Sequence, residues 1–316
     1  MEHHLPTYAE YIDTLKQGID GRTDIRMETC GMLQYETKDG IQEYPYYKVS
    51  SADIRPTDKI LLIRATIHGD ETAGAMTIMR HVAALFDYAH AHNVKLIIFP
   101  LDNPSGFEHN TRYNIEEGKG DGGNNDFIRY ELEDGSIVGD IGTSEHFKTW
   151  RWASDPDLHV HLPKETAMLH AELKKLPLTA IRGVLDIHQD NYIIFPGAYH
   201  YAYGDKERYR PIVDAIERVT TVFKGEHIDS GYLNGPSYHA EIPDSQGNII
   251  PDEFDPVTDS LGFIDRHDCT LPDLFFHLGA DHCITVETTT KLTPEQCDEI
   301  NIIWVKGLVD LISKGK

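Results

Sequence analysis

The sequence predicts one α/β domain, in which a mixed sheet lies between layers of helices. An apolar run at residues 60–67 is followed by about twenty residues with helical periodicity, and then by a second apolar run at residues 94–99. This strand–helix–strand order implies a parallel pair of strands. The chain has 316 residues, of which 40% are hydrophobic, and this is enough for a packed core of that class.

Turn signals and periodicity define the elements in the first third of the chain. Residues 7–20 predict a short helix, and residues 27–50 predict a hairpin that turns at Lys38-Asp39-Gly40. A strand at residues 60–67 leads into a helix that begins near Asp70. One face of this helix carries apolar residues at helical spacing, which indicates packing in the core. These residues are Met76, Met79, Val82, Ala83 and Phe86.

The same alternation of strands and helices continues in the rest of the chain. Helices are expected at residues 164–176 and 206–223, and strand-like runs lie within residues 181–194 and at 283–288. The last helix begins at Thr293-Pro294-Glu295-Gln296. This is a capping box with proline at the first helical position.

Two segments interrupt the pattern. Residues 114–163 are rich in Gly and Asp and poor in aliphatic residues, and residues 229–272 are acidic and rich in turn residues. Long irregular segments in a compact domain are usually functional or disordered. We therefore expect a single domain over residues 1–316, with two loop-rich insertions that narrow a cleft.

Charge and composition exclude several classes of protein. With 52 acidic and 29 basic residues the net charge is −23, which disfavours nucleic acid and anionic membranes as partners. The sequence contains no run of 18 apolar residues, so we predict no membrane span. The amino terminus lacks the pattern of a secretory signal peptide. The four cysteines have no Cys-x-x-Cys spacing, so we expect free thiols and a cytoplasmic protein. The oligomeric state stays open.

Polar side chains follow the predicted strands at the points where the strands end. His68 and Glu71 come after the strand at residues 60–67, His188 ends a later strand, and Glu287 ends the last one. In α/β folds this edge of the sheet is where ligands bind. A catalytic zinc takes three protein ligands and leaves one position for water, and two imidazoles favour zinc over harder ions. We expect one Zn²⁺ bound by His68, Glu71 and His188.

Each of these residues also has a purely structural interpretation. A carboxylate in the first turn of a helix interacts favourably with the helix dipole, which accounts for Glu71 without a metal. By its local pattern alone, Glu287 is equally consistent with a surface carboxylate at a strand end.

His159 and His161 share one face of an extended segment. No third ligand lies near them in the sequence, so we interpret them as surface residues.

Four ordered motifs resemble those of the M14 zinc carboxypeptidase superfamily, including its aspartoacylase and succinylglutamate desuccinylase branch. They are His68-Gly69-Asp70-Glu71-Thr72-Ala73-Gly74, Asn103-Pro104-Ser105-Gly106-Phe107 followed by Arg112, Asp186-Ile187-His188, and Glu287-Thr288. The resemblance spans about residues 59–287. It implies a three-layer α/β/α fold whose twisted mixed sheet has about eight strands, with the site at the carboxyl ends of the central parallel strands.

The resemblance also implies roles for individual residues. Glu287 is expected to act as general base and acid, and Arg112 to stabilise the oxyanion that forms when zinc-bound water attacks the carbonyl. Asp186 and Asp190 are candidates for orienting a ligand imidazole. Candidate substrate contacts are Asn124, Asn125, Arg129 and Tyr238, with Tyr232 as an alternative to Tyr238 for the mobile tyrosine of many relatives.

One stretch departs from the family pattern. Relatives carry an arginine that clamps the terminal carboxylate of the substrate, whereas residues 121–127 here place Asn125 or Asp126 at that position. Neither side chain can form a bidentate cationic clamp, and Arg129 is a candidate replacement.

The expected function follows from these motifs. We expect a metallocarboxypeptidase-like, zinc-dependent hydrolase of amide bonds that acts on a small peptide. The alternative is an N-acyl amino acid deacylase of the aspartoacylase/succinylglutamate desuccinylase type. A catalytically inactive metal-binding module is less consistent with the presence of Glu287.

Overall fold

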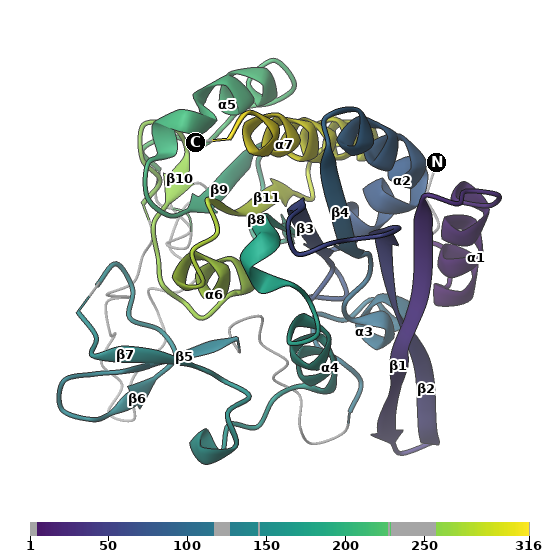
Figure 1. Cartoon of the computed structure of the whole chain (residues 1–316), viewed down its shortest axis with the longest axis horizontal. Helices are drawn as coiled ribbons and strands as arrows, with labels where there is room; N and C mark the ends of the chain where they lie inside the picture. Colours follow the sequence, from purple (N-terminus) through teal and green to yellow (C-terminus); the bar gives the residue numbers. More distant parts are fainter. Residues whose placement is uncertain (1–4, 117–126, 145, 227, 229–256, 316) are drawn as a thin grey trace.

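The computed structural model describes residues 5–116, 127–144, 146–226, 228 and 257–315. An eight-stranded mixed sheet forms its centre, in the order β1-β2-β4-β3-β8-β11-β9-β10 (Figure 1). The strands are β1 (Ile25–Thr37), β2 (Gly40–Ser51), β3 (Lys59–Ala65), β4 (Val94–Phe99), β8 (Ile181–Asp190), β9 (Ala198–Ala202), β10 (Phe263–Ile264) and β11 (His282–Thr289). The expected mixed sheet of about eight strands is confirmed.

Four adjacent strands in the middle of the sheet are parallel. Strand β3 pairs in parallel with β4 and with β8, and β8 pairs in parallel with β11. On either side, β2 and β9 run antiparallel to this group. Strand β3 is buried along almost its whole length, as expected for a parallel strand covered on both faces. The carboxyl ends of the four strands therefore lie at one edge of the sheet.

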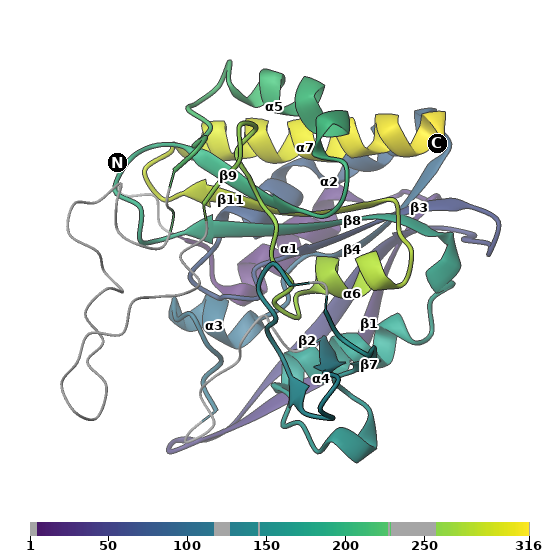
Figure 2. The same cartoon turned by 90° about the vertical axis from the view of Figure 1, so that its left-hand side faces the viewer.

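Helices cover both faces and complete the three layers (Figure 2). On one face, α1 (Tyr8–Gly18), α2 (Ala73–Ala91), α5 (Arg210–Ile216) and α7 (Pro294–Lys314) share one apolar core with the sheet. On the other face, α4 (Lys164–Leu173) and α6 (Leu271–His277) contribute to a second core. The capping box at the start of α7 is present, since the Thr293 hydroxyl and the Gln296 side chain each accept a hydrogen bond from the other residue's backbone N–H.

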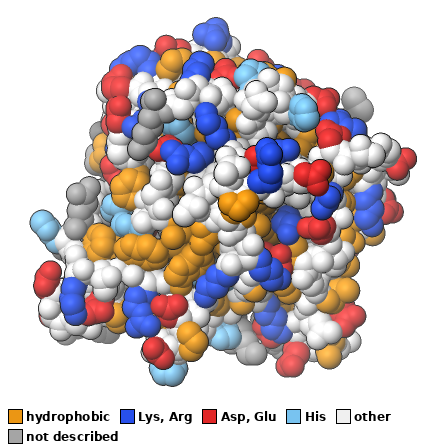
Figure 3. All heavy atoms as spheres, in the orientation of Figure 1, with side chains coloured by type: hydrophobic (Ala, Val, Ile, Leu, Met, Phe, Trp, Pro, Cys, Tyr) orange, Lys and Arg blue, Asp and Glu red, His pale blue; other side chains and the backbone are white. Residues whose placement is uncertain are grey.

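Residues 114–163 contain secondary structure that the sequence did not reveal. A three-stranded antiparallel sheet has the order β6-β5-β7, with β5 at Ile128–Glu131, β6 at Ile137–Val138 and β7 at Thr149–Trp152. Strands of two to four residues are too short for a periodic pattern to be recognised. Hydrophobic side chains gather between this small sheet and α6 on the face drawn in Figure 3.

Two other boundaries differ from the prediction. The helix expected at residues 206–223 is a 3₁₀ turn, Lys206–Tyr209, followed by the short helix α5, which ends at Ile216. In the segment 229–272, only residues 257–272 are described, and they include β10 and the start of α6. A short helix that was not predicted, α3 (Pro104–His109), follows β4.

Among the described residues, no helix is long and apolar enough to cross a bilayer.

Candidate metal centre

A tight loop between β3 and α2 carries the first two candidate ligands. The hydroxyl of Thr66 donates to the carbonyl of Glu71, and the backbone N–H of Glu71 donates to the carbonyl of His68. Helix α2 begins only at Ala73, with Thr72 as its N-cap. Glu71 thus precedes the first helical turn, so the interpretation of Glu71 as a first-turn carboxylate is wrong.

A glycine makes this loop geometry possible. A Cβ added to Gly69 would lie 2.1 Å from the carbonyl carbon of Gly106, in helix α3. The backbone N–H of Gly69 donates to the carbonyl of Arg112 at 3.0 Å. The close approach of the two backbones therefore holds the loop that bears His68 against the segment that bears Arg112.

Strands β8 and β11 present the other two candidate residues side by side. His188 and Glu287 are direct partners in the register of these parallel strands. The Nδ1 atom of His188 lies 3.9 Å from a carboxylate oxygen of Glu287. Their adjacency follows from strand register, which brings together residues 99 positions apart in the sequence (287 − 188).

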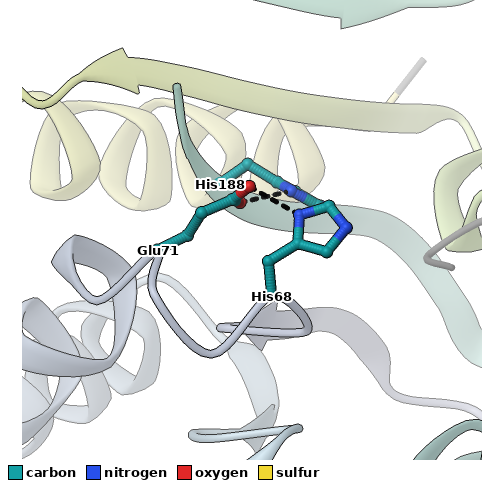
Figure 4. A group of neighbouring side chains, drawn as sticks. All are labelled: His68, Glu71 and His188. Carbon is teal, nitrogen blue, oxygen red and sulfur yellow. Dashed lines mark hydrogen bonds and ion pairs between the residues drawn. The ribbon is translucent and has the colours of Figure 1, made fainter. Parts of the chain in front are cut away.

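The three predicted metal ligands converge on one point (Figure 4). The Nδ1 atom of His68 lies 2.5 Å from one oxygen of Glu71, and the Nδ1 atom of His188 lies 2.8 Å from the other. All three residues are buried. Burial lowers the pKa of His68. Burial alone would also lower the pKa of His188, but the carboxylates of Asp186 and Glu71 outweigh it and raise that pKa.

This donor set fits a divalent metal ion. One ligand atom from each residue lies within 4.8 Å of the others, as expected where a single ion is shared. Two imidazole nitrogens and a carboxylate form a typical catalytic zinc set, and both imidazoles offer the same atom, Nδ1. His68, Glu71 and His188 would hold the ion.

A buried charged group lies behind His188. The Nε2 atom of His188 is 3.3 Å from the carboxylate of Asp186, on the side away from Glu71. The guanidinium of Arg64 donates two hydrogen bonds to Asp186, one of them 2.9 Å long. Burial alone would raise the pKa of Asp186, but Arg64 outweighs it and lowers that pKa to about 2. Asp186 is therefore an ionised group placed to orient the ligand imidazole.

A cavity of about 210 Å³ opens beside His68 and Glu71. The following residues line it: His68, Glu71, Arg112, Asp190, Asn191, Tyr192, Tyr199, Tyr201, Asp268, Thr270, Thr285 and Glu287. The predicted ligands His68 and Glu71, together with Arg112 and Glu287, thus share one cavity, whose wall also includes Asp190.

Two of these residues have properties suited to chemistry. Burial, together with the charges of Glu71 and Asp190, raises the pKa of Glu287, a direction that favours a carboxyl group which both accepts and donates a proton. Arg112 donates a hydrogen bond of 2.7 Å to Glu71. Its guanidinium therefore lies beside the point where the ligands converge.

The remaining predicted residues lie elsewhere. Arg129 is on β5, where its guanidinium donates to the carbonyl of Ile128, and it is not among the described residues that line the cavity. Asn124, Asn125, Tyr238 and the alternatives Asp126 and Tyr232 fall outside the described residues.

Sequence reasoning missed part of the cavity wall and the arginine behind it. Tyr199 and Tyr201 lie on β9, and Asp268 lies on the loop before α6. No local pattern marks these three residues. Arg64 did carry a signal, because it is a charged residue in the middle of an apolar strand, where only a buried partner can stabilise it.

A comparison with known families matches the segment that carries the first motif. Residues 57–121 match the family model of the succinylglutamate desuccinylase/aspartoacylase catalytic domain. The matched segment includes His68, Glu71 and Arg112. A search of the curated proteins finds no match.

Several solved structures share the fold. A protein of Shewanella amazonensis that is provisionally classed as a metallopeptidase has a TM-score of 0.62 at 19% identity, over 96% of this chain and 92% of that one. A metallo-carboxypeptidase from Burkholderia cenocepacia has a TM-score of 0.56 at 11% identity, over 96% and 68%. Bovine thrombin-activatable fibrinolysis inhibitor has a TM-score of 0.56 at 13% identity, over 98% and 97%.

The resemblance to the M14 zinc carboxypeptidase superfamily is confirmed. Identities of 11–19% with the solved structures establish the shared fold, and the family match adds the segment that carries the first motif. Together they support a hydrolase of the M14 type.

Proposed function

We propose that this protein is a zinc-dependent hydrolase of amide bonds that resembles the metallocarboxypeptidases. One observation carries the proposal. His68, Glu71 and His188 converge beside Glu287 and Arg112 at the edge of a single cavity. Each chemical function that amide hydrolysis requires then has a side chain in reach of one substrate carbonyl.

The residues divide the chemistry as follows. When bound, zinc polarises the substrate carbonyl and lowers the pKa of a coordinated water to about 7. Glu287 accepts a proton from the attacking water and passes it to the leaving nitrogen, for which its raised pKa suits it. Arg112 donates hydrogen bonds to the oxyanion that develops on the carbonyl oxygen, a contact worth about 3 kcal/mol for a single well-placed donor.

The charges of the cavity favour a substrate with a positively charged group. Among the described residues that line it, Arg112 is the only lysine or arginine, and it shares the cavity with the carboxyl groups of Glu71, Asp190, Asp268 and Glu287. Asp190 is already engaged, because its oxygens accept hydrogen bonds from the backbone of Tyr192 and Ile193 and from the hydroxyl of Tyr199. Burial and the charge of Asp273 raise the pKa of Asp268 to about 7, against the opposing charge of Arg266. We assign Asp268 to the substrate's positive group, because a cation placed there would hold this carboxyl group ionised.

The deacylase remains the second candidate. The match to the succinylglutamate desuccinylase/aspartoacylase family over residues 57–121 favours it. The acidic cavity disfavours it, because an N-acylated acidic amino acid would bring negative charge next to Asp190 and Asp268. The peptidase therefore leads.

A panel of substrates tests the proposal. Zinc-loaded protein is assayed against peptides that end in Lys, Leu or Glu, each as the free acid and as the C-terminal amide, and against N-acetyl and N-succinyl amino acids. Release of a C-terminal amino acid indicates the peptidase, and release of a small carboxylic acid indicates the deacylase. Hydrolysis of none of these substrates would contradict the proposal.

Two variants assign the turnover to the site. Glu287→Gln should lower kcat by several orders of magnitude while the zinc content stays the same. Glu299→Gln, on the exposed face of α7, is the matched control and should behave like the wild type. Unchanged turnover in Glu287→Gln would remove Glu287 from the mechanism.

A further inference from the structure

A second group of potential metal ligands lies below the sheet, outside the catalytic cavity. His267 precedes α6, and Asp273 and His277 lie on α6 at a spacing of four residues, which places them on one helix face. Tyr130 of β5 meets them from the three-stranded sheet. The group therefore joins two elements that are distant in sequence.

The separations within the group match those in a metal site. The Oδ1 atom of Asp273 lies 2.7 Å from Nδ1 of His267 and 3.4 Å from Nε2 of His277. The hydroxyl of Tyr130 lies 3.0 Å from Nε2 of His277 and 3.5 Å from Nδ1 of His267. Zinc–ligand bonds of 2.0–2.1 Å in a tetrahedron place neighbouring ligands about 3.3 Å apart.

Hydrogen bonds orient Asp273 toward the two imidazoles. Its Oδ2 atom accepts the hydroxyl of Tyr130 at 2.5 Å and the backbone N–H of Cys269 at 3.0 Å. The other oxygen, Oδ1, is thereby directed at His267 and His277. Nearby groups that hold a carboxylate in this way are typical of metal sites in proteins.

The charge of Asp273 is a second, independent observation. Its side chain is 0% exposed, and no lysine or arginine forms an ion pair with it among the described residues. Its partners are the imidazoles of His267 and His277, and a metal ion bound between them would supply a full positive charge to this buried carboxylate.

We propose that His267, Asp273 and His277 bind a second metal ion, with the hydroxyl of Tyr130 holding the carboxylate of Asp273 in place. Two imidazoles and a carboxylate favour zinc. The Tyr130 hydroxyl, 3.0 Å from Nε2 of His277, covers the side that a catalytic site would leave open, which favours a structural ion. Its role is to fasten the three-stranded sheet to α6 and to the loop that carries Asp268, in the wall of the catalytic cavity.

Metal analysis without reference to activity tests this proposal. Zinc is measured in the double variant His68→Ala, His188→Ala, purified and then equilibrated with a small excess of zinc and desalted. We expect one ion per chain, because only the second site remains, and no ion once His277→Ala is added. His161→Ala, which removes an exposed imidazole outside both groups, is the control and should leave one ion. An absence of zinc in the double variant would overturn the proposal.

Thermal unfolding provides a second measurement that separates a metal site from a purely hydrogen-bonded network. We expect a chelator to lower the Tm of the double variant by several degrees and to have no effect once His277→Ala is present. A loss of stability in His277→Ala that is the same with and without chelator would indicate a hydrogen-bonded network only, and would overturn the proposal. Because neither measurement uses turnover, failure of the proposed hydrolase activity leaves both results interpretable.

Discussion

Arg64 and Asp186 face each other on the adjacent parallel strands β3 and β8, and the guanidinium of Arg64 binds both oxygens of the carboxylate. Both side chains are 0% exposed. Two residues further along β8, on the same face of the strand, His188 places its Nε2 atom 3.3 Å from that carboxylate. The buried pair of Arg64 and Asp186 therefore helps to fix the orientation of His188, a proposed metal ligand.

The first prediction concerns Asp186. Asp186→Asn should weaken zinc binding by about 10- to 100-fold, because the neutral amide no longer fixes the imidazole of His188 or raises its basicity. The dissociation constant is measured by competition with a chromophoric chelator. Asp214→Asn, an exposed position on α5, is the control.

The stability of the same variant should also fall. Removing Asp186 breaks a buried ion pair and leaves Arg64 with Asp102 alone, 3.6 Å away, at a cost of up to about 3–5 kcal/mol. Urea unfolding of the metal-free protein measures this cost separately from metal affinity. Unchanged zinc affinity in a folded Asp186→Asn variant would limit the role of Asp186 to stability.

The second prediction concerns pH and Asp102. This carboxyl group lies 3.6 Å from Arg64 and accepts the hydroxyl of Tyr46. Burial raises its pKa to about 7, against the opposing effect of Arg64. The folded protein therefore binds a proton that the unfolded chain, with an ordinary carboxyl pKa, releases near pH 4. The contribution of Asp102 to stability should fall as the pH rises from about 4 to about 7, and should be constant above that range.

The comparison with Asp102→Asn isolates this contribution. The free energy of unfolding of the metal-free protein is measured by urea titration between pH 4.5 and 8. The difference between wild type and variant should change by about 4 kcal/mol at most over this range. Asp186 does not disturb the comparison, since its pKa of about 2 keeps it ionised throughout. A difference that is independent of pH would contradict the raised pKa of Asp102.

The third prediction concerns Gly69. An alanine Cβ would lie 2.1 Å from the backbone of Gly106, where no flexible side chain can move aside. Gly69→Ala should therefore push the loop that bears His68 away from α3, which destabilises the protein by about 1–3 kcal/mol and lowers zinc affinity. At Gly139 the nearest atom to an added Cβ is 3.4 Å away, so Gly139→Ala is the matched control. Normal zinc binding by Gly69→Ala would show that the loop tolerates the shift.

The fourth prediction concerns selectivity. Asp268→Asn should raise KM for a peptide with a C-terminal lysine by about tenfold, the effect of losing one charge-assisted contact. The KM for a peptide with a C-terminal leucine should change little, and zinc content should stay the same. Asp265→Asn, an exposed position on the same loop, controls for general electrostatic effects. Equal losses on both peptides would exclude selective binding of a cation by Asp268.

The sequence by itself determined the elements that local patterns specify. Apolar runs defined β3, β4, β8 and β11, and the motif at Thr293 defined the start of α7. Because parallel strands end at one edge of a sheet, these runs together with the family motifs predicted that His68, Glu71 and His188 would meet. These features depend on residues that are close in sequence or on the direction in which the strands run, so the sequence alone could reveal them.

Only the tertiary structure decided which distant side chains complete the site. The register of β3 against β8 pairs Arg64 with Asp186, and the packing of β5 against α6 brings Tyr130 to Asp273. The same packing places Asp268 in the cavity wall and leaves Arg129 outside the described lining. Such contacts depend on strand register and on how layers pack, which arise from many weak interactions across the whole chain and leave no local pattern in the sequence.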